Sequence, residues 1–260
     1  HDSLGHHGMA YELCASLSLT FKKDVKVKDN ETFFDKHVDA PLVAIDELEA
    51  CSRFAALRID NITVGESPKW LQERLSAIGQ RSINSIVDIT NYVQFSLNKP
   101  MHAYDARSIK GTLTARFAHE GEALTTLDDK SLTLNISTLV IADDEKVLGL
   151  AGIKGGKFSG IQSDTTSVIL ESANFDPILT RRTSSKYNIR TDASKRFENG
   201  IANNLVIEGL HMTANLILEL CPTAKKSLVT DIYPKKDVPY YVGISKREVN
   251  AILGTSYDDE

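Results

Sequence analysis

The spacing of apolar residues changes twice along this chain, and that change limits the folds it can adopt. From Trp70 to Leu97, apolar residues recur every three or four positions, as they do on one face of a helix. From residue 111 to residue 172 they alternate with polar residues, as in strands that bury one face. Helical spacing returns over residues 203–220. This order predicts a fold that mixes helices and sheets.

Two helices with clear ends are expected before the strands. Ser67 can accept a backbone hydrogen bond as the N-cap of the first helix, Pro68 suits its first turn, and Gly79 can adopt the left-handed conformation that ends it. The second helix is expected over residues 83–97, where Asn98-Lys99-Pro100 ends it.

Short strands joined by acidic turns are expected in the middle of the chain. Asp128-Asp129 and Asp143-Asp144-Glu145 each lie between two apolar runs, which is typical of hairpins. The expected strands are residues 42–45, 52–60, 113–117, 124–127, 132–136, 139–142, 147–151 and 168–170. Two further helices are expected, one opened by Asp176-Pro177 and one over residues 203–220.

The two ends of the chain have the character of other modules. A short helix is expected over residues 9–20, and residues 22–38 are charged and poorly patterned, as in a linker or an exposed edge segment. A strand over residues 238–242 and a helix capped by Ser245 and Glu248 are expected at the other end. One strand and one helix cannot bury a core. We therefore expect residues 1–38 to be the tail of a preceding module with its linker, and residues 236–260 to be the truncated start of the next.

Charge and cysteine content narrow the functional classes. The net charge of −5 argues against a globally basic nucleic-acid binder. Cys14, Cys51 and Cys221 lie far apart without CxxC spacing, so neither a disulfide framework nor a thiolate zinc site is expected, and a reducing compartment fits best. The sequence has no apolar run of membrane-spanning length and no signal-peptide pattern at its start.

Residues 181–196 carry a local excess of positive charge, with six Lys or Arg residues against one acid. Such a segment can contact a phosphate backbone. It can equally be a solvated face that acids elsewhere balance. The sequence by itself leaves both interpretations open.

Three features are candidates for a binding site, each with a structural alternative. The glycines between Gly149 and Gly160 form either a bulged turn or a floor where a ligand approaches the backbone. Glu171 ends an apolar strand, so its carboxylate either has buried partners or reaches solvent at an edge. His102 is a lone histidine after a helix, with a structural or a catalytic role. P-loop, GxGxxG, HExxH and GxSxG patterns are absent from the sequence, which argues against nucleotide sites of those kinds, a zinc hydrolase and an elbow-type serine hydrolase.

Six stretches are more specific together than any of them is alone. They are Ser67-Pro68-Lys69-Trp70-Leu71, residues 82–93 (SINSIVDITNYV), Pro100-Met101-His102-Ala103-Tyr104-Asp105, residues 151–156 (AGIKGG), residues 170–175 (LESANF) and residues 191–200 (TDASKRFENG). In this order they closely resemble the tRNA-editing domain of the bacterial phenylalanyl-tRNA synthetase β subunit. The resemblance is strong over about residues 41–235, and departures are mild: the family often has Phe at the position of Tyr104, Met at Lys154 and Arg at Asn199.

The resemblance implies a fold class and an activity. The fold would be α+β, with a large editing domain of mixed sheets and flanking helices arranged as two intertwined subdomains over residues 39–235. The activity would be hydrolysis of the ester of Tyr-tRNA(Phe), formed when tyrosine is attached in error. A site that hydrogen-bonds the extra hydroxyl rejects phenylalanine, because phenylalanine would leave a buried polar group unpaired.

The resemblance also assigns substrate-binding residues. Glu171 would accept the hydrogen bond of the tyrosine hydroxyl. Gly152 and Gly155 would give the ring room beside the backbone, so that a side chain at Gly155 should block the pocket. Ala193 would border the same pocket, and Thr191 would help to orient the ligand.

The catalytic end of the pocket would hold the ester, the terminal ribose and the attacking water. The residues that match it are Thr90, Asn91 and His102. No general base is assigned to His102, because positioning of water beside a labile ester can suffice, with a tRNA hydroxyl assisting. The residues expected to contact tRNA are Arg181, Arg182, Lys186 and Arg190.

As part of the whole enzyme, the chain would have tRNA(Phe), tyrosine and the α subunit as partners, in a cytoplasmic heterotetramer of two α and two β subunits. ATP and Mg²⁺ would serve aminoacylation in the α subunit, and no cofactor or metal is expected in this segment. Two alternatives are a non-catalytic tRNA-contacting scaffold with a vestigial pocket and a stand-alone editing or nucleic-acid-binding protein. The module remnants at both ends argue against the second alternative.

Overall fold

The computed structural model describes residues 2–21, 34–238 and 240–258. The helical elements are η1 Asp2–Leu4, α1 His6–Ser16, α2 Lys69–Ala77, α3 Ser85–Leu97, η3 Ala106–Ser108, η4 Lys157–Ser159, α4 Pro177–Tyr187, α5 Asp192–Phe197, α6 Leu205–Leu220 and α7 Lys246–Leu253. The strands are β1 Val43–Ile45, β2 Cys51–Asp60, β3 His102–Asp105, β4 Leu113–Phe117, β5 Ala123–Thr125, β6 Ser131–Thr133, β7 Leu139–Ala142, β8 Val147–Leu150, β9 Lys154–Gly155, β10 Ser167–Phe175, β11 Lys225–Lys226 and β12 Thr230–Ile232.

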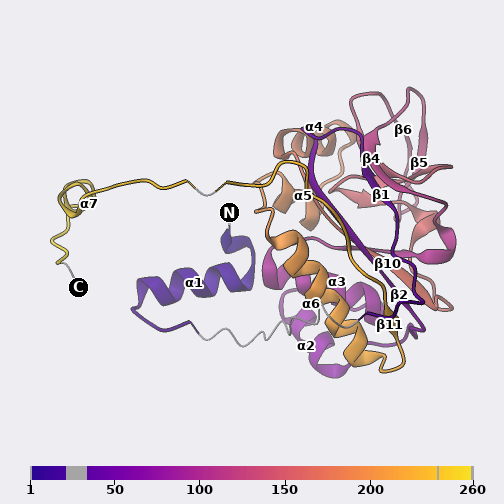
Figure 1. Ribbon diagram of the computed structural model, residues 1–260, viewed down its shortest axis with the longest axis horizontal. Coiled ribbons are helices and arrows are strands. Elements are labelled where there is room, and N and C mark those ends of the chain that lie inside the picture. Colours follow the sequence, from indigo (N-terminus) through magenta and orange to yellow (C-terminus); the bar gives the residue numbers. More distant parts are fainter. Residues whose placement is uncertain (1, 22–33, 239, 259–260) are drawn as a thin grey trace.

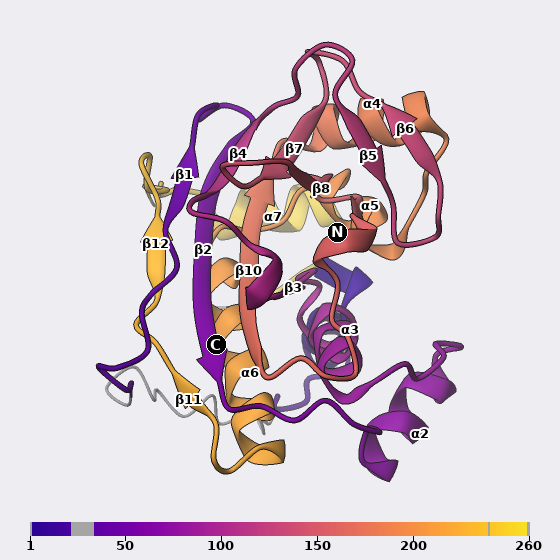
Figure 2. The same ribbon diagram turned by 90° about the vertical axis from the view of Figure 1, so that its right-hand side faces the viewer.

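The strands form two five-stranded sheets and one hairpin. The first sheet has the order β1-β4-β7-β8-β9, in which only the β1–β4 pair is parallel. The second has the order β11-β2-β10-β3, with β12 also paired to β2. The β5–β6 hairpin is a separate two-stranded sheet, and its Leu124 and Leu132 pack in one core cluster with Val140 of the first sheet. Figure 2 shows the long β2 and β10 strands side by side, with α6 behind them.

The β2–β10 pair separates two cores. One face packs Phe54, Ala56 and Ile169 against residues of the first sheet such as Leu113 and Ile141. The other face packs against α2, α3 and α6, which lie together on one side of the second sheet (Figure 1). Because both faces are buried, most residues of the two strands are apolar. The architecture confirms the expected α+β class.

Most of the expected element ends are present. Asn84 caps α3 by accepting hydrogen bonds from the backbone N–H groups of Ile86 and Val87, and Asn98 ends that helix with a φ of 60°. Gly79 has a φ of 77° after α2. The capping box of Ser245 and Glu248 opens α7.

Two expectations are wrong. Ser67 does not cap α2: Pro68 is the N-cap, and the Ser67 hydroxyl donates to Asp88 Oδ2 at 2.6 Å. The side chain thus serves a contact with α3 instead of its own helix. Residues 238 and 240–242 form no strand, and Val238, Tyr240, Tyr241 and Val242 are between 75% and 98% exposed. Apolar residues alone did not produce a strand there because no described strand lies beside them to pair with.

The predicted linker over residues 22–38 falls mostly on residues 22–33, which lie outside the described residues. Within residues 2–21, 34–238 and 240–258, no helix has both the length and the apolar character needed to cross a bilayer.

Candidate functional site

The register between β3 and β10 brings the candidate site together. His102 lies opposite Glu171, and Tyr104 lies opposite Ile169. Residues two apart on a strand share a face, so His102, Tyr104 and Glu171 point to the same side of the sheet. That side faces the first sheet, where Tyr104 and Ile169 join the core.

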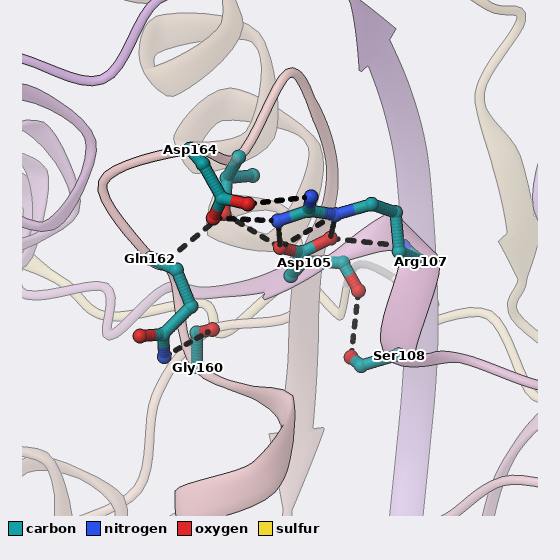
Figure 3. A network of polar contacts seen from close by, with 7 residues as sticks. Asp105, Arg107, Ser108, Gly160, Gln162 and Asp164 are labelled. Atoms are coloured by element: carbon teal, nitrogen blue, oxygen red, sulfur yellow. Dashed lines mark hydrogen bonds and ion pairs between the residues drawn. The ribbon is translucent and has the colours of Figure 1, made fainter.

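A polar network holds the end of β3 against the segment that leads into β10 (Figure 3). The guanidinium of Arg107 contacts Asp105 at 2.7 Å and Asp164 at 2.9 Å, and the Thr165 hydroxyl donates to Asp105 at 2.6 Å. Burial raises the pKa of the Asp105 carboxyl, but hydrogen bonds from Arg107 and Thr165 outweigh it, so the pKa lies below its usual value. The network connects the two segments that carry His102, Tyr104 and Glu171.

A cavity lies where the two sheets meet. Its walls come from the β3 region, the turn between β8 and β9, the β10 strand and helix α5. The lining residues are Pro100, Met101, His102, Tyr104, Ile141, residues 149–155, Glu171, Ala173, Phe175, Ala193 and Phe197. Most of these are apolar, and a few polar groups converge among them, which is the usual character of a small-molecule site.

Glu171 is the buried carboxylate of this cavity, with 6% of its surface exposed. Its Oε2 accepts a hydrogen bond from the hydroxyl of Tyr104, which is also buried. Lys99 is fully buried nearby, where its Nζ donates to the carbonyl of Ala173 and lies 5.0 Å from the centre of the Phe197 ring.

Burial dominates the ionisation of both charged groups. It raises the pKa of Glu171 to about 7, against the lowering effects of the Tyr104 hydrogen bond and the Lys99 charge. Burial likewise lowers the pKa of Lys99 to about 7, against the attraction of Glu171. The Tyr104 pKa is raised well above its ordinary value by burial and by Glu171, so its hydroxyl is a proton donor at neutral pH.

His102 presents a free nitrogen in the same cavity. Its Nε2 is buried and has no hydrogen-bond partner among the described residues. Burial lowers the pKa of His102 to about 4, so the ring is neutral at pH 7. A neutral imidazole with so low a pKa is a weak general base, but it can hold a water molecule or a polar ligand atom in place.

Gly152 in the β8–β9 turn and Gly155 in β9 lie close to the aromatic walls. A Cβ atom at Gly155 would lie 2.5 Å from Cε1 of His102. Gly152 has a φ of 68°, and a Cβ atom there would lie 2.9 Å from both Phe175 and Phe197. The absence of side chains at these two positions therefore lets the backbone pack directly on the rings that surround the cavity.

Of the four other residues predicted for the pocket and its catalytic end, one lines the cavity and three do not. Ala193 lines it. Thr191 is not among the lining residues: its hydroxyl caps α5 and donates to the carbonyl of Ile153 at 2.9 Å, which fixes the turn before β9. Thr90 and Asn91 lie on α3 and do not line it either, and the Thr90 hydroxyl donates to the carbonyl of Val87.

The basic segment is mostly solvent-facing. Arg181, Arg182, Lys186 and Arg190 are all exposed, on or just after α4. Arg190 pairs with Glu198 at 3.0 Å. Arg196 differs, because it is buried against the Phe95 ring and donates to the carbonyls of Asp192 and Leu4.

The buried charge of Lys99 and the role of Tyr104 were not predicted from the sequence. Lys99 stood in the Asn98-Lys99-Pro100 run that ends a helix, which gave no sign that its charge is buried. Tyr104 had one usable signal: it lies two residues after His102 in a short strand, so both side chains share a face. Among the described residues, no group of three or more His, Cys, Asp or Glu side chains could hold a metal ion.

The sequence model of the B3/4 domain matches residues 50–222, which include every lining residue of the cavity. The chain belongs to the B3/4 domain family. The resemblance found from the sequence motifs is thereby confirmed, since the relatives of this B3/4 domain are phenylalanine–tRNA ligase β subunits.

Two comparisons describe how similar the relatives are. The phenylalanine–tRNA ligase β subunit of Solibacter usitatus is 45% identical over 222 residues, 85% of this chain and 28% of that protein. That of Protochlamydia amoebophila is 39% identical over 266 residues, 98% of this chain and 32% of that protein. The B3/4 domain chain thus spans about a third or less of the length of these relatives.

A solved structure shares the fold. The crystal structure of an N-terminal fragment of the phenylalanyl-tRNA synthetase β subunit from Pyrococcus horikoshii aligns with a TM-score of 0.50 and 11% identity. The alignment covers 87% of this chain and 63% of that one. At this identity the comparison supports the α+β architecture of the B3/4 domain and nothing finer.

Proposed function

We propose that this chain hydrolyses the ester of tyrosine mischarged on tRNA(Phe). The single observation that carries the proposal is the buried carboxylate of Glu171 in a cavity with otherwise mainly apolar walls. Tyr104 engages one of its oxygens, and the described residues offer no hydrogen bond to the other. A tyrosine side chain in this cavity, which Phe175 and Phe197 line, could donate its hydroxyl to that oxygen, whereas phenylalanine would leave the oxygen unpaired at a cost of about 1–3 kcal/mol.

Hydrolysis would take place at the His102 end of the cavity. The unpaired Nε2 of His102 can hold the attacking water or the ester carbonyl. Because the ring is neutral and weakly basic, its contribution would be positioning, and a hydroxyl of the tRNA would assist proton transfer. Thr90 and Asn91 would bind the terminal ribose outside the cavity, and Thr191 would act through the turn that it fixes.

The larger assembly is part of the same proposal. The chain would work in a cytoplasmic synthetase of two α and two β subunits, whose α subunit attaches phenylalanine with ATP and Mg²⁺. The exposed basic residues on α4 would contact the tRNA, and the substrate-binding residues would be Glu171, Gly152, Gly155 and Ala193 with Thr191 as their support.

The test is deacylation of Tyr-tRNA(Phe) by this chain and by variants. Glu171→Ala should lower the rate at least about tenfold and should weaken discrimination against Phe-tRNA(Phe). Glu219→Ala, which removes an exposed carboxylate from α6, is the matched control and should retain the full rate. Equal rates for all three proteins would refute the site.

The non-catalytic alternative has its own outcome in this test. If crystals soaked with L-tyrosine show the ligand at Glu171 while no variant or wild-type chain deacylates Tyr-tRNA(Phe), the pocket binds without catalysing. Restoration of hydrolysis when the same segment is placed in a complete synthetase would instead show that tRNA positioning was missing.

A further inference from the structure

Tyr104 and Glu171 form a buried pair inside the cavity that the proposed function does not explain. Both side chains lie on the same face of the second sheet. Glu171 on β10 is opposite His102 on β3, and Tyr104 follows His102 by two residues on β3. The phenol is 2% exposed, and its hydroxyl donates to Oε2 of Glu171. Burying a hydroxyl in an apolar wall costs free energy unless the hydroxyl has a hydrogen-bond partner there. A phenylalanine would fill nearly the same volume without that cost.

We propose that Tyr104 is a positioning residue for amino-acid selection: it holds one carboxylate oxygen of Glu171 and leaves the other oxygen to accept a hydrogen bond from a ligand hydroxyl. This inference rests on the proposed function and adds a residue to its selection step.

The surroundings of Glu171 leave little other restraint. The titratable groups near it are Tyr104 and His102 on β3, Lys99 before β3, and Cys51 on β2. Lys99 donates to the carbonyl of Ala173 rather than to Glu171, and Nε2 of His102 has no partner among the described residues. Tyr104 therefore makes the one side-chain hydrogen bond that the described residues offer to this carboxylate.

Loss of the phenol would change both the orientation and the charge of Glu171. Without Tyr104 the carboxylate can rotate, so no oxygen is presented to the ligand in a fixed direction. The Tyr104 hydrogen bond also lowers the pKa of Glu171, so its removal leaves more of the carboxyl neutral near pH 7. A neutral carboxyl loses the charge-assisted hydrogen bond that favours a hydroxylated ligand.

The test compares wild type with Tyr104→Phe, which removes the hydroxyl alone. Calorimetry measures the affinity of the chain for L-tyrosine and for L-phenylalanine between pH 5.5 and pH 9. Tyr104→Phe should lower the preference for tyrosine about tenfold at pH 7. The pH at which the preference is half maximal should also move upward. A carboxyl-carbon NMR titration of Glu171 in the ligand-free chain should show the same upward movement.

The matched control is Tyr92→Phe. Tyr92 lies on α3, outside the cavity, where its hydroxyl accepts a hydrogen bond from Arg74 at 2.7 Å. This variant should keep both the preference and the Glu171 midpoint of wild type. Denaturant unfolding of each variant verifies that it is folded at the temperature of the binding experiment.

Three other outcomes overturn the inference, and they differ from one another. An unchanged preference and midpoint in Tyr104→Phe, with wild type still preferring tyrosine, would remove the role of Tyr104 and leave the proposed function intact. Tighter tyrosine binding by Tyr104→Phe would show that the phenol occupies the ligand's place. No preference in wild type would refute the proposed function and this inference together.

Discussion

At the scale of single residues, Lys99 and Glu171 make the stability of the fold depend on pH in opposite senses. The folded chain keeps a proton on Glu171 up to a pKa of about 7, whereas the unfolded chain releases it near 4.5, so stability falls as the pH rises between these values. The folded chain releases the Lys99 proton at a pKa of about 7, whereas the unfolded chain keeps it to 10.5, so stability rises over that interval.

The two groups together predict a minimum of their stability contribution near pH 7. The measurement is the free energy of unfolding in urea from pH 5 to pH 9.5 for wild type and for the double variant Lys99→Met/Glu171→Gln. The difference between the two proteins should pass through its minimum near neutral pH. A difference that changes in one direction across the whole range would contradict the prediction.

A second prediction concerns Gly155 alone. A Cβ atom there would lie 2.5 Å from the His102 ring, and Gly155 lies in a strand without a positive φ, so the obstacle is the ring and not the backbone. Gly155→Ala should lower the free energy of unfolding by about 1–3 kcal/mol. Gly65→Ala, where the new methyl group meets nothing within 4 Å, should change it by less than about 1 kcal/mol. Equal effects of the two variants in chemical denaturation would count against this packing.

At the scale of elements, Asp88 joins α2 to α3. Its carboxylate is fully buried and accepts hydrogen bonds from the hydroxyls of Ser67 and Ser82 and from the backbone N–H of Ile83. Asp88→Ala would leave the buried Ser67 hydroxyl unpaired and would remove the acceptor of the two less buried donors, so it should lower the free energy of unfolding by about 3 kcal/mol. Asp39→Ala removes an exposed carboxylate and should stay within about 0.5 kcal/mol of wild type. A small loss for Asp88→Ala in the same denaturation series would show that solvent replaces the carboxylate.

The same elements show what a sequence can and cannot predict. Helix ends at Gly79, Asn98 and Ser245 were predictable because their caps lie within a few residues of the helix. Ser67 was not, because its partner Asp88 lies on another helix. The site follows the same division: the motifs brought out Glu171 and His102, whereas Lys99 becomes part of the cavity surroundings only when β3 and β10 pair.

At the scale of the whole molecule, the proposed function and the charge distribution together predict where tRNA would bind. The chain is acidic overall, yet Arg181 and Arg182 are exposed on α4. Arg181→Glu/Arg182→Glu should weaken tRNA binding and should flatten the slope of log K against log salt concentration by about one to two units. Binding titrations at several salt concentrations measure both. Lys235→Glu/Lys236→Glu changes the net charge equally at another exposed place, and an equal weakening there would mean that only the net charge matters.

The pairing of β2 with β10 affects how the chain folds while it is being synthesised. Residues 51–60 form a strand that is apolar on both faces, and their main partner is residues 167–175, which the ribosome synthesises much later. Until those residues emerge from the ribosome, β2 lacks the strand that completes both cores, and the backbone N–H and C=O groups that pair with β10 have no strand partner. A nascent chain that stalls before residue 167 should therefore need a chaperone to stay out of aggregates. Folding of the completed chain should be slow, because closing such a long loop precedes most of the stabilising contacts.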